Sequence, residues 1–268
     1  MKVSVLGPEG TYSSHAARLL VPEAELVLAR SNPEAIRQVS IGASSRGVVP
    51  IENSIGGIVT ASLDGLFEHN LMIVDEQELD IHHTLAGLEQ PERPGTIKKI
   101  LSHPQGLAQC ARYLATHYPE AELVAMDSTA QGMETIAETE DRTALAIGPD
   151  PAAEVYGLEK VDQAIEDEAG NQTRFVAFSK EAKTDKEQDF VMIAVVPDGD
   201  RPGLIHDVTG VFKEQGINLV DLHSRPMRTG LGSYKFYMRL DMKSRDPRYE
   251  RIAEMVGSLG NQVIRMSA

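Results

Sequence analysis

This sequence has a single cysteine, no tryptophan and no long apolar run. The single cysteine among 268 residues, Cys110, excludes a disulfide within the chain and predicts a reducing, cytoplasmic location. No run of about 18 apolar residues occurs, so we expect no transmembrane helix. The apolar part of the first seven residues is too short for a signal peptide and predicts a strand. Tryptophan is absent, so tyrosine would have to supply any intrinsic fluorescence.

Basic residues are also few relative to acidic ones. The 26 Lys and Arg residues against 40 Asp and Glu residues give a net charge of -14. No basic patch is visible, which argues against nucleic-acid binding. An anionic substrate would therefore need a locally positive site within an unfavourable overall field. The hydrophobic fraction of 41% is ordinary for a globular protein, and the length allows two domains.

Short apolar strands alternate with helical patterns through the first 180 residues. This alternation predicts an α/β fold with two lobes, the first formed by residues 1–80 together with 160–179 and the second by residues 81–159. Clefts between lobes are common binding sites for small molecules, so we expect the ligand there.

Two polar, glycine-containing loops link a strand to a helix in the first lobe. In the first loop, Thr11 and Ser13 lie near the start of a helix, where hydroxyls and free backbone N–H groups suit an anion. Ordinary helix capping explains the same residues equally well. In the second loop, Glu52 is a general acid, a hydrogen-bond acceptor or a structural cap. Neither loop has the dinucleotide-binding pattern, so no nicotinamide cofactor is expected.

The histidines and the cysteine give no metal-binding pattern. His82 and His83 are adjacent on an expected strand within 76–85, so their side chains point to opposite faces. We expect one of them to pack in the interior and the other to line the cleft. Cys110 falls inside an expected helix over 107–118 and is predicted to be a small core residue.

A polar turn enters a strand at residues 170–175. Thr173 and Arg174 lie side by side there. The arginine offers a planar fork for a carboxylate, and the threonine can donate one hydrogen bond. Such a pair suits an anionic substrate that loses an oxygen leaving group, although an ordinary polar loop is the alternative.

The composition changes after residue 179. Residues 180–188 form a charged linker, and residues 189–268 have the order βαββαβ, the ferredoxin-like pattern. This small module has a limited core, so pairing with a second copy is plausible.

Four motifs, followed by the βαββαβ module, resemble the prephenate dehydratase family with its C-terminal ACT regulatory domain. The resemblance covers nearly the whole chain, and its motifs are at residues 6–13, 50–57, 102–110 and 171–175. It implies a two-lobed catalytic domain, similar to periplasmic binding proteins, at residues 1–179 and an ACT domain at residues 189–268.

The resemblance also implies a reaction, the conversion of prephenate to phenylpyruvate, water and carbon dioxide without a metal or cofactor. Thr173 would hydrogen-bond the departing hydroxyl, and Arg174 would hold a substrate carboxylate. Further substrate contacts are expected from polar residues and one aromatic residue of the motifs, together with one histidine: Thr11, Ser13, Glu52, Asn53, Ser54, His83, Asn171 and Phe175.

In this family, phenylalanine binds between two ACT domains, which implies feedback inhibition in a homodimer or homotetramer. The corresponding effector residues in this chain are Gly203, Leu204, Ile205, His223, Ser224, Arg225 and Pro226. His223 stands where the family usually has glutamate. The effector could therefore differ, or His223 could make the response depend on pH. Alternatively, ACT pairing only holds the oligomer together.

The sequence is also compatible with other functions. Two lobes with a cleft also describe a solute-binding protein, against which the missing signal peptide and the Thr173–Phe175 motif argue. An amino-acid sensor with a decayed catalytic half and an arogenate dehydratase are further alternatives. Because no helical domain precedes Met1, the sequence predicts a monofunctional chain without the chorismate mutase that some relatives carry.

Overall fold

The computed structural model describes residues 1–182, 184–227 and 233–268. The chain divides into two compact units. The first unit comprises residues 1–63 and 76–177, and the second comprises residues 64–75 and 178–268. One division falls inside helix α3 (Thr60–Glu68), between Leu63 and Asp64. The expected linker at 180–188 remains a prediction. Every helix in the described ranges is too short or too polar to cross a bilayer.

The first sheet carries the residues of two sequence motifs. Among the described residues it has six strands, in the order β2-β1-β3-β11-β5, with β4 paired to β3. Strand β1 pairs in parallel with both β2 and β3, as expected for strands joined through helices. The elements are β1 (Lys2–Leu6), α1 (Tyr12–Leu20), β2 (Glu25–Ala29), α2 (Asn32–Ser40), β3 (Arg46–Asn53), β4 (Gly57–Ile58), α3, β5 (Met72–Asp80) and β11 (Gln172–Ser179).

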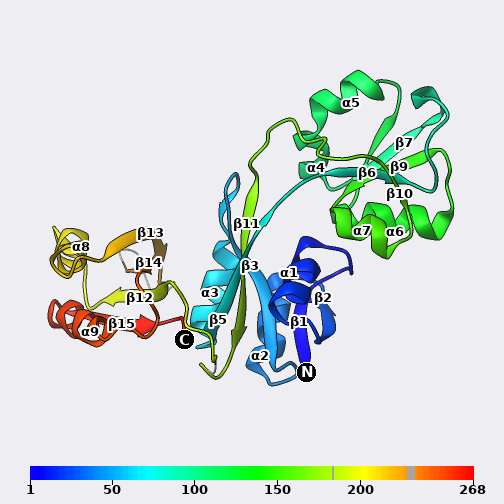
Figure 1. Cartoon of the computed structure of the whole chain (residues 1–268). Coiled ribbons are helices and arrows are strands. Elements are labelled where there is room, and N and C mark those ends of the chain that lie inside the picture. The colour runs from blue at the N-terminus through cyan, green and yellow to red at the C-terminus, as the bar shows by residue number, and fades with distance from the viewer. Residues whose placement is uncertain (183, 228–232) are drawn as a thin grey trace. The chain divides into compact units, whose positions relative to one another are not determined.

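The second sheet is covered by helices on both faces. Five strands of the described chain form it, in the order β10-β6-β9-β7-β8. On β9, Leu145 packs in a core with α5, whereas its neighbour Ala146 packs in a core with α6 and α7. Figure 1 shows α5 on one side of this sheet and α6 and α7 on the other. The elements are β6 (Thr84–Gly87), η1 (Pro94–Thr96), β7 (Lys99–Ser102), α4 (Pro104–Gln109), α5 (Ala111–His117), β8 (Glu122–Ala125), α6 (Thr129–Thr139), β9 (Ala144–Gly148), α7 (Asp150–Val155) and β10 (Glu159–Asp162).

Two local expectations were wrong. The helix expected over 107–118 is two helices, α4 and α5, because the backbone of Cys110 leaves helical geometry at φ -113°, ψ 17°. Cys110 still packs in the core, fully buried, and this burial raises the pKa of its thiol to about 12. The strand expected within 76–85 is interrupted, because β5 ends at Asp80 in one sheet and β6 begins at Thr84 in the other.

The second unit contains the βαββαβ module, which confirms the predicted order. Of the residues that the structure describes there, four strands form an antiparallel sheet in the order β13-β14-β12-β15. Both helices pack on one core with Val195, Met238 and Leu240. The expected start of β14 at Gly232 lies outside the described residues. The elements are β12 (Val191–Pro197), α8 (Leu204–Glu214), β13 (Asn218–Pro226), β14 (Tyr234–Asp241), α9 (Arg248–Ser258) and β15 (Asn261–Arg265).

Candidate active site

The side chain of Asn53 joins two sequence motifs that are far apart in the chain. Asn53 ends β3, which lies next to β11 in the first sheet. Its Oδ1 accepts hydrogen bonds from the backbone N–H groups of Ile55 at 3.1 Å and Gly56 at 2.6 Å. Its Nδ2 donates to Asn171 Oδ1 at 2.6 Å and to Thr173 Oγ1 at 2.8 Å. We call Asn53, Asn171 and Thr173 the Asn53 network.

Ser54 fixes the backbone that carries this network. Its N–H donates to the carbonyl of Gln172 at 2.8 Å, and its hydroxyl donates to the carbonyl of Gly170 at 3.1 Å. The same hydroxyl accepts from the N–H of Gln172 at 2.8 Å. Both hydrogen-bonding functions of the Ser54 hydroxyl are therefore in use, which gives this residue a structural role beside the site.

The hydroxyl of Thr173 accepts a hydrogen bond from Asn53. The side-chain nitrogen of Asn53 can only donate, so Thr173 Oγ1 is the acceptor in their hydrogen bond. Among the described residues, no hydrogen bond donated by the Thr173 hydroxyl is present. The residue is 8% exposed. It lines a hollow of about 110 Å³ together with Glu52, Ser54, Glu78, Gln172 and Arg174.

Arg174 lies among glutamates. Its Nη2 and Nε donate to Glu78 Oε1 at 2.6 and 3.0 Å, its Nη1 donates to Glu52, and its Nε is 3.9 Å from Glu76 Oε2. Burial alone would lower the pKa of Arg174, but the Glu78 hydrogen bond and the charges of Glu52 and Glu76 outweigh burial and raise it. A substrate carboxylate that bound the edge of this guanidinium formed by Nη2 and Nε would displace Glu78.

Glu76 and Glu78 were not among the site residues predicted from the sequence. A signal for them was present, because residues two apart on a strand share one face. Glu76 and Glu78 both lie on β5, next to the strand that carries Arg174. Two carboxylates on the same face of a strand repel each other, so this spacing predicts a cationic side chain beside them on a neighbouring strand.

Thr11 and Ser13 lie apart from the Asn53 network. Thr11 Oγ1 accepts from the N–H of Ser14 at 3.2 Å and donates to the carbonyl of Leu6 at 3.1 Å. Thr11 thus caps α1, which was the structural alternative in the sequence. Ser13 is buried at 5% exposure. Within the described residues, no hydrogen bond joins either hydroxyl to the Asn53 network.

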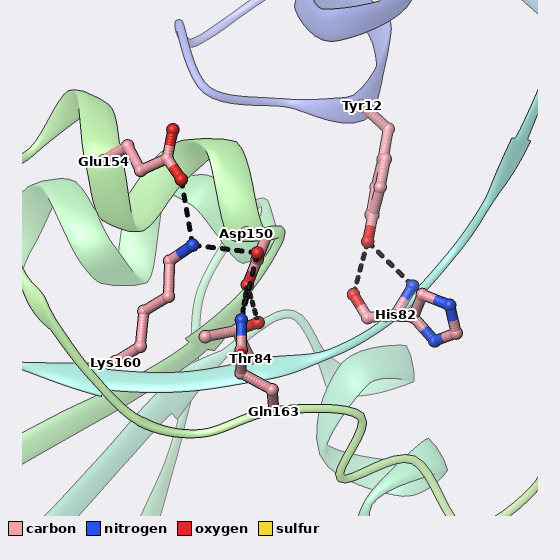
Figure 2. A network of polar contacts seen from close by, with 7 residues as sticks. All are labelled: Tyr12, His82, Thr84, Asp150, Glu154, Lys160 and Gln163. Atoms are coloured by element: carbon pink, nitrogen blue, oxygen red, sulfur yellow. Dashed lines mark hydrogen bonds and ion pairs between the residues drawn. The ribbon is translucent and has the colours of Figure 1, made fainter.

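The two histidines lie between β5 and β6. The backbone N–H of His82 donates to the hydroxyl of Tyr12 at 2.8 Å, and this hydroxyl donates to the His82 carbonyl (Figure 2). The Glu166 carboxylate accepts from the N–H of His83 at 2.9 Å and lies 2.7 Å from Nδ1 of His82. Burial alone would raise the pKa of Glu166, but the His83 and His82 hydrogen bonds outweigh it and lower that pKa.

His83 is buried and His82 is not. The His83 residue is 5% exposed, and its Nε2 is 2.7 Å from Gln109 Oε1. Its Nδ1 is buried and has no hydrogen-bond partner in the described ranges. Phe175 is also buried, at 3% exposure, and packs in the interior. The proposed contacts of His83 and Phe175 with substrate therefore remain predictions.

A larger cavity adjoins the Asn53 network through Asn171. Its volume is about 450 Å³, and its lining includes the Glu166 carboxylate that binds His83, and the Gln109 amide. Arg112 at this cavity is paired with Asp167, with 3.6 Å between Nε and Oδ2. The lining residues are Ile55, Ala108, Gln109, Arg112, Glu166, Asp167, Glu168 and Asn171.

Asp150 joins β6, β10 and α7. It accepts hydrogen bonds from Lys160 at 2.8 Å, from Gln163 at 2.9 Å and from the hydroxyl of Thr84, and Lys160 also contacts Glu154 at 2.9 Å (Figure 2). Burial alone would raise the pKa of Asp150, but these hydrogen bonds outweigh it and lower that pKa. Among the residues that the structure describes, no group of His, Cys, Asp and Glu side chains is arranged to hold a metal ion.

The expected effector residues fall into two groups. Gly203, in a left-handed conformation at φ 80°, precedes α8 and lines a cavity of about 400 Å³ together with Leu204 and Ile205. The second group lies on β13, and none of its residues is among the described residues that line this cavity: His223, Ser224, Arg225 and Pro226. His223 Nε2 is 3.9 Å from Asp221 Oδ1.

Arg225 instead belongs to a buried cluster of charged residues in the second unit. Asp64 on α3 accepts from Arg225 at 2.7 Å and from the hydroxyl of Tyr237 at 2.9 Å, and it lies 3.0 Å from Lys235 Nζ. Lys235 also sits 4.3 Å from the centre of the Phe67 ring. Burial alone would raise the pKa of Asp64, but Arg225, Lys235 and Tyr237 lower it. We call Asp64, Arg225, Lys235 and Tyr237 the Asp64 cluster.

Comparison with known proteins assigns both parts of the chain. The family model for prephenate dehydratase matches residues 3–183, and the ACT domain model matches residues 198–248. A prephenate dehydratase of Methanocaldococcus jannaschii is 35% identical over 257 residues, which cover 94% of this chain and 90% of the relative.

Solved structures give the same result. The prephenate dehydratase of Staphylococcus aureus superposes with a TM-score of 0.86 and 31% identity, over 100% of this chain and 99% of the other. That of Arthrobacter aurescens, in complex with L-Phe, superposes with a TM-score of 0.86 and 27% identity, over 100% and 90%. The matched motifs include those that meet in the Asn53 network, and the chain belongs to the prephenate dehydratase family.

Proposed function

We propose that this protein converts prephenate to phenylpyruvate, water and carbon dioxide. In that reaction the bond between the ring and its carboxylate breaks, and the electron pair enters the ring. The ring becomes aromatic as the hydroxyl on the opposite carbon leaves. Aromatisation supplies the driving force, so the protein has to orient the substrate and stabilise the departing oxygen. The family and the relatives' names support the overall reaction.

Thr173 is the residue that we assign to the departing hydroxyl. The observation that carries this assignment is its hydroxyl, which accepts from Asn53 and keeps its own hydrogen for a molecule in the adjoining hollow. Thr173 donates a hydrogen bond to the leaving oxygen, and solvent supplies the proton that completes the water molecule. A weak donor is sufficient because the leaving group is uncharged before the reaction and its departure is strongly favoured.

Arg174 is proposed to bind a substrate carboxylate by exchanging partners. Among its glutamates, Glu78 has the most exposed side chain, at 54%, compared with 29% for Glu52 and 22% for Glu76. A carboxylate from the substrate takes the place of Glu78, while Glu52 continues to hold the other edge of the guanidinium. The bidentate geometry of arginine suits such an exchange.

Regulation by phenylalanine is part of the proposal. The Arthrobacter aurescens relative was solved with L-Phe, and the present chain has an ACT domain with a cavity beside Gly203, Leu204 and Ile205. We propose that phenylalanine binds in this module and inhibits turnover in a homodimer or homotetramer. A role of His223 in that response and the cytoplasmic location expected from the single cysteine stay predictions.

The test is phenylpyruvate formation by the purified chain, with Thr173→Val and Thr173→Ser as matched variants. Valine keeps the shape of threonine without the hydroxyl, and serine keeps the hydroxyl. We expect Thr173→Val to lose about 100-fold to 10,000-fold in turnover and Thr173→Ser to lose much less. Wild-type turnover by a folded Thr173→Val protein would remove Thr173 from the mechanism.

The same assay tests the substrate and the effector. Arogenate is offered in parallel, and turnover of arogenate alone would replace prephenate as the substrate. Phenylalanine is added to the wild-type reaction, and undiminished turnover at saturating concentrations would contradict the feedback proposal while leaving the enzyme assignment intact.

A further inference from the structure

We propose that Asn53 is a positioning residue, whose side-chain amide fixes the direction in which Thr173 presents its hydroxyl hydrogen to the substrate. This inference rests on the function proposed above. It differs from the expectation drawn from the sequence, which placed Asn53 in direct contact with the substrate.

The orientation of the Asn53 amide is determined by its backbone neighbours. Two N–H groups, those of Ile55 and Gly56, point at Oδ1. A flipped amide would set its NH₂ group against both of them and lose two hydrogen bonds. The approach is close, since a Cβ added to Gly56 would lie 3.3 Å from Asn53 Oδ1. The NH₂ group therefore faces β11.

Acceptors on and beside β11 receive both hydrogens of this NH₂ group. Asn171 Oδ1 accepts at 2.6 Å, Thr173 Oγ1 at 2.8 Å and the carbonyl of Gln172 at 3.1 Å. Each of these partners is uncharged. Asn53 is thus held by hydrogen bonds on both sides of its amide, and it cannot turn to a substrate without breaking several of them.

This arrangement decides what Thr173 can do. A hydroxyl has one hydrogen, and the Asn53 NH₂ group occupies one acceptor direction of Thr173 Oγ1. The Thr173 hydrogen must point away from Asn53. Because the side chain of threonine is branched at Cβ, its first torsion angle is restricted as well. Within the described residues this hydrogen makes no hydrogen bond, so it is available to a molecule bound in the hollow.

Two substitutions of Asn53 distinguish positioning from a structural role. Asn53→Asp keeps the shape but turns a donor into an acceptor, so the introduced carboxylate captures the Thr173 hydrogen. Asn53→Ala leaves the hydroxyl free but undirected. We expect turnover to fall about 10-fold in Asn53→Ala and about 100-fold in Asn53→Asp, with KM within about threefold of the wild type.

The order of these two effects is the decisive result. If Asn53 served only the fold, both substitutions would lower the free energy of unfolding, and kcat of each folded variant would stay close to that of the wild type. An Asn53→Asp protein that is as fast as Asn53→Ala, or faster, overturns the proposal. A large rise in KM with unchanged kcat also overturns it, because that result assigns Asn53 to substrate binding.

A double variant makes the test independent of how well Asn53→Asp folds. If Asn53 acts through Thr173, the Asn53→Ala, Thr173→Val protein is as fast as Thr173→Val alone, within about twofold. Multiplied losses in the double variant contradict the proposal. Thermal unfolding of each variant confirms that it is folded at the assay temperature. A wild-type protein without dehydratase activity would refute the proposed function itself, whereas active wild type with the wrong order of variants refutes only this inference.

Discussion

Two largely buried polar groups of residues in this protein have opposite character. The Asn53 network consists of two amides and a hydroxyl and carries no charge. The Asp64 cluster contains one carboxylate held by a guanidinium, an ammonium and a phenol. In the first, one hydroxyl hydrogen is left for another molecule. In the second, each of the donors named above is directed at the same carboxylate.

The difference indicates what each group of residues does for the molecule. A neutral hydrogen bond contributes about 0.5–1.5 kcal/mol to stability, so the loss of one bond of the Asn53 network has a modest effect on folding. Removal of one member of a buried ion pair costs about 3–5 kcal/mol, because the remaining charge has no compensation. The Asp64 cluster holds the second unit together, whereas the Asn53 network can serve a reaction.

The largest expected effect is that of Asp64→Ala. This change leaves Lys235, whose side chain is 5% exposed, without its carboxylate. We expect unfolding of the protein to become easier by about 3–5 kcal/mol, with kcat unchanged at temperatures where the variant is folded. Chemical denaturation measures the loss.

The matched control is Glu9→Ala, which removes the exposed pair of Glu9 with Arg18 at 3.1 Å. It should cost less than about 1 kcal/mol. If Asp64→Ala costs no more than Glu9→Ala, the contrast between the two groups of residues is lost.

A smaller effect is expected for Lys235→Met. Asp64 then keeps its hydrogen bonds with Arg225 and Tyr237, so no charge is left alone. The lost contacts are those of the ammonium with Asp64 and with the Phe67 ring. We expect a loss of about 1.5–3 kcal/mol in the free energy of unfolding. A cost equal to that of Asp64→Ala would show that Lys235 is the main support of the carboxylate.

At the active site, Glu78→Gln should improve substrate binding. The change removes the negative charge that competes for Arg174, while Glu52 continues to hold the guanidinium. KM for prephenate is expected to fall about threefold to tenfold, a difference of about 1 kcal/mol. Asp80→Asn is the control, because Asp80 lies on the same strand and contacts Gln172 at 2.8 Å instead. An unchanged or higher KM for Glu78→Gln would argue against an exchange of partners at Arg174.

The smallest expected effect is that of acidic pH on the stability of the protein. The pKa of Asp64 is lower in the folded protein, so its contribution to stability is complete above the unfolded pKa of about 3.9 and is lost as pH falls through the folded pKa. The difference in Tm between wild type and Asp64→Asn should therefore shrink below about pH 4. A difference that stays constant from pH 7 to strongly acidic conditions would contradict this account.

The order of helices and strands along the chain was predictable from the sequence, but the order of the strands within each sheet was not. Alternating apolar patterns gave the βαββαβ module, and the motif around Thr173 marked the candidate site. Asn53 and Thr173 are 120 residues apart in the chain, and they meet because β3 and β11 are adjacent in the sheet. Strand order is decided by packing of the whole sheet, which local patterns do not contain.

Other misses have local causes. The helical spacing continues through Cys110, yet α4 ends at Gln109 and α5 begins at Ala111. A periodic pattern of apolar residues does not show such a change of helix direction. The charged partners of Arg225 were unforeseen because Asp64 lies on a helix assigned to the other domain. The role of Arg225 as an effector residue stays a prediction, and the motif contains no information on which residues its side chain contacts.

The division inside α3 has a consequence for how this protein can be cut and recombined. The second unit is made of two separate stretches of chain, 64–75 and 178–268. A protease acting near residue 183 would therefore leave the regulatory module attached through Asp64 and its partners. A chain truncated there would keep Asp64 but lose its partners Arg225, Lys235 and Tyr237. A recipient enzyme given this module would therefore also need the turn of helix that carries Asp64.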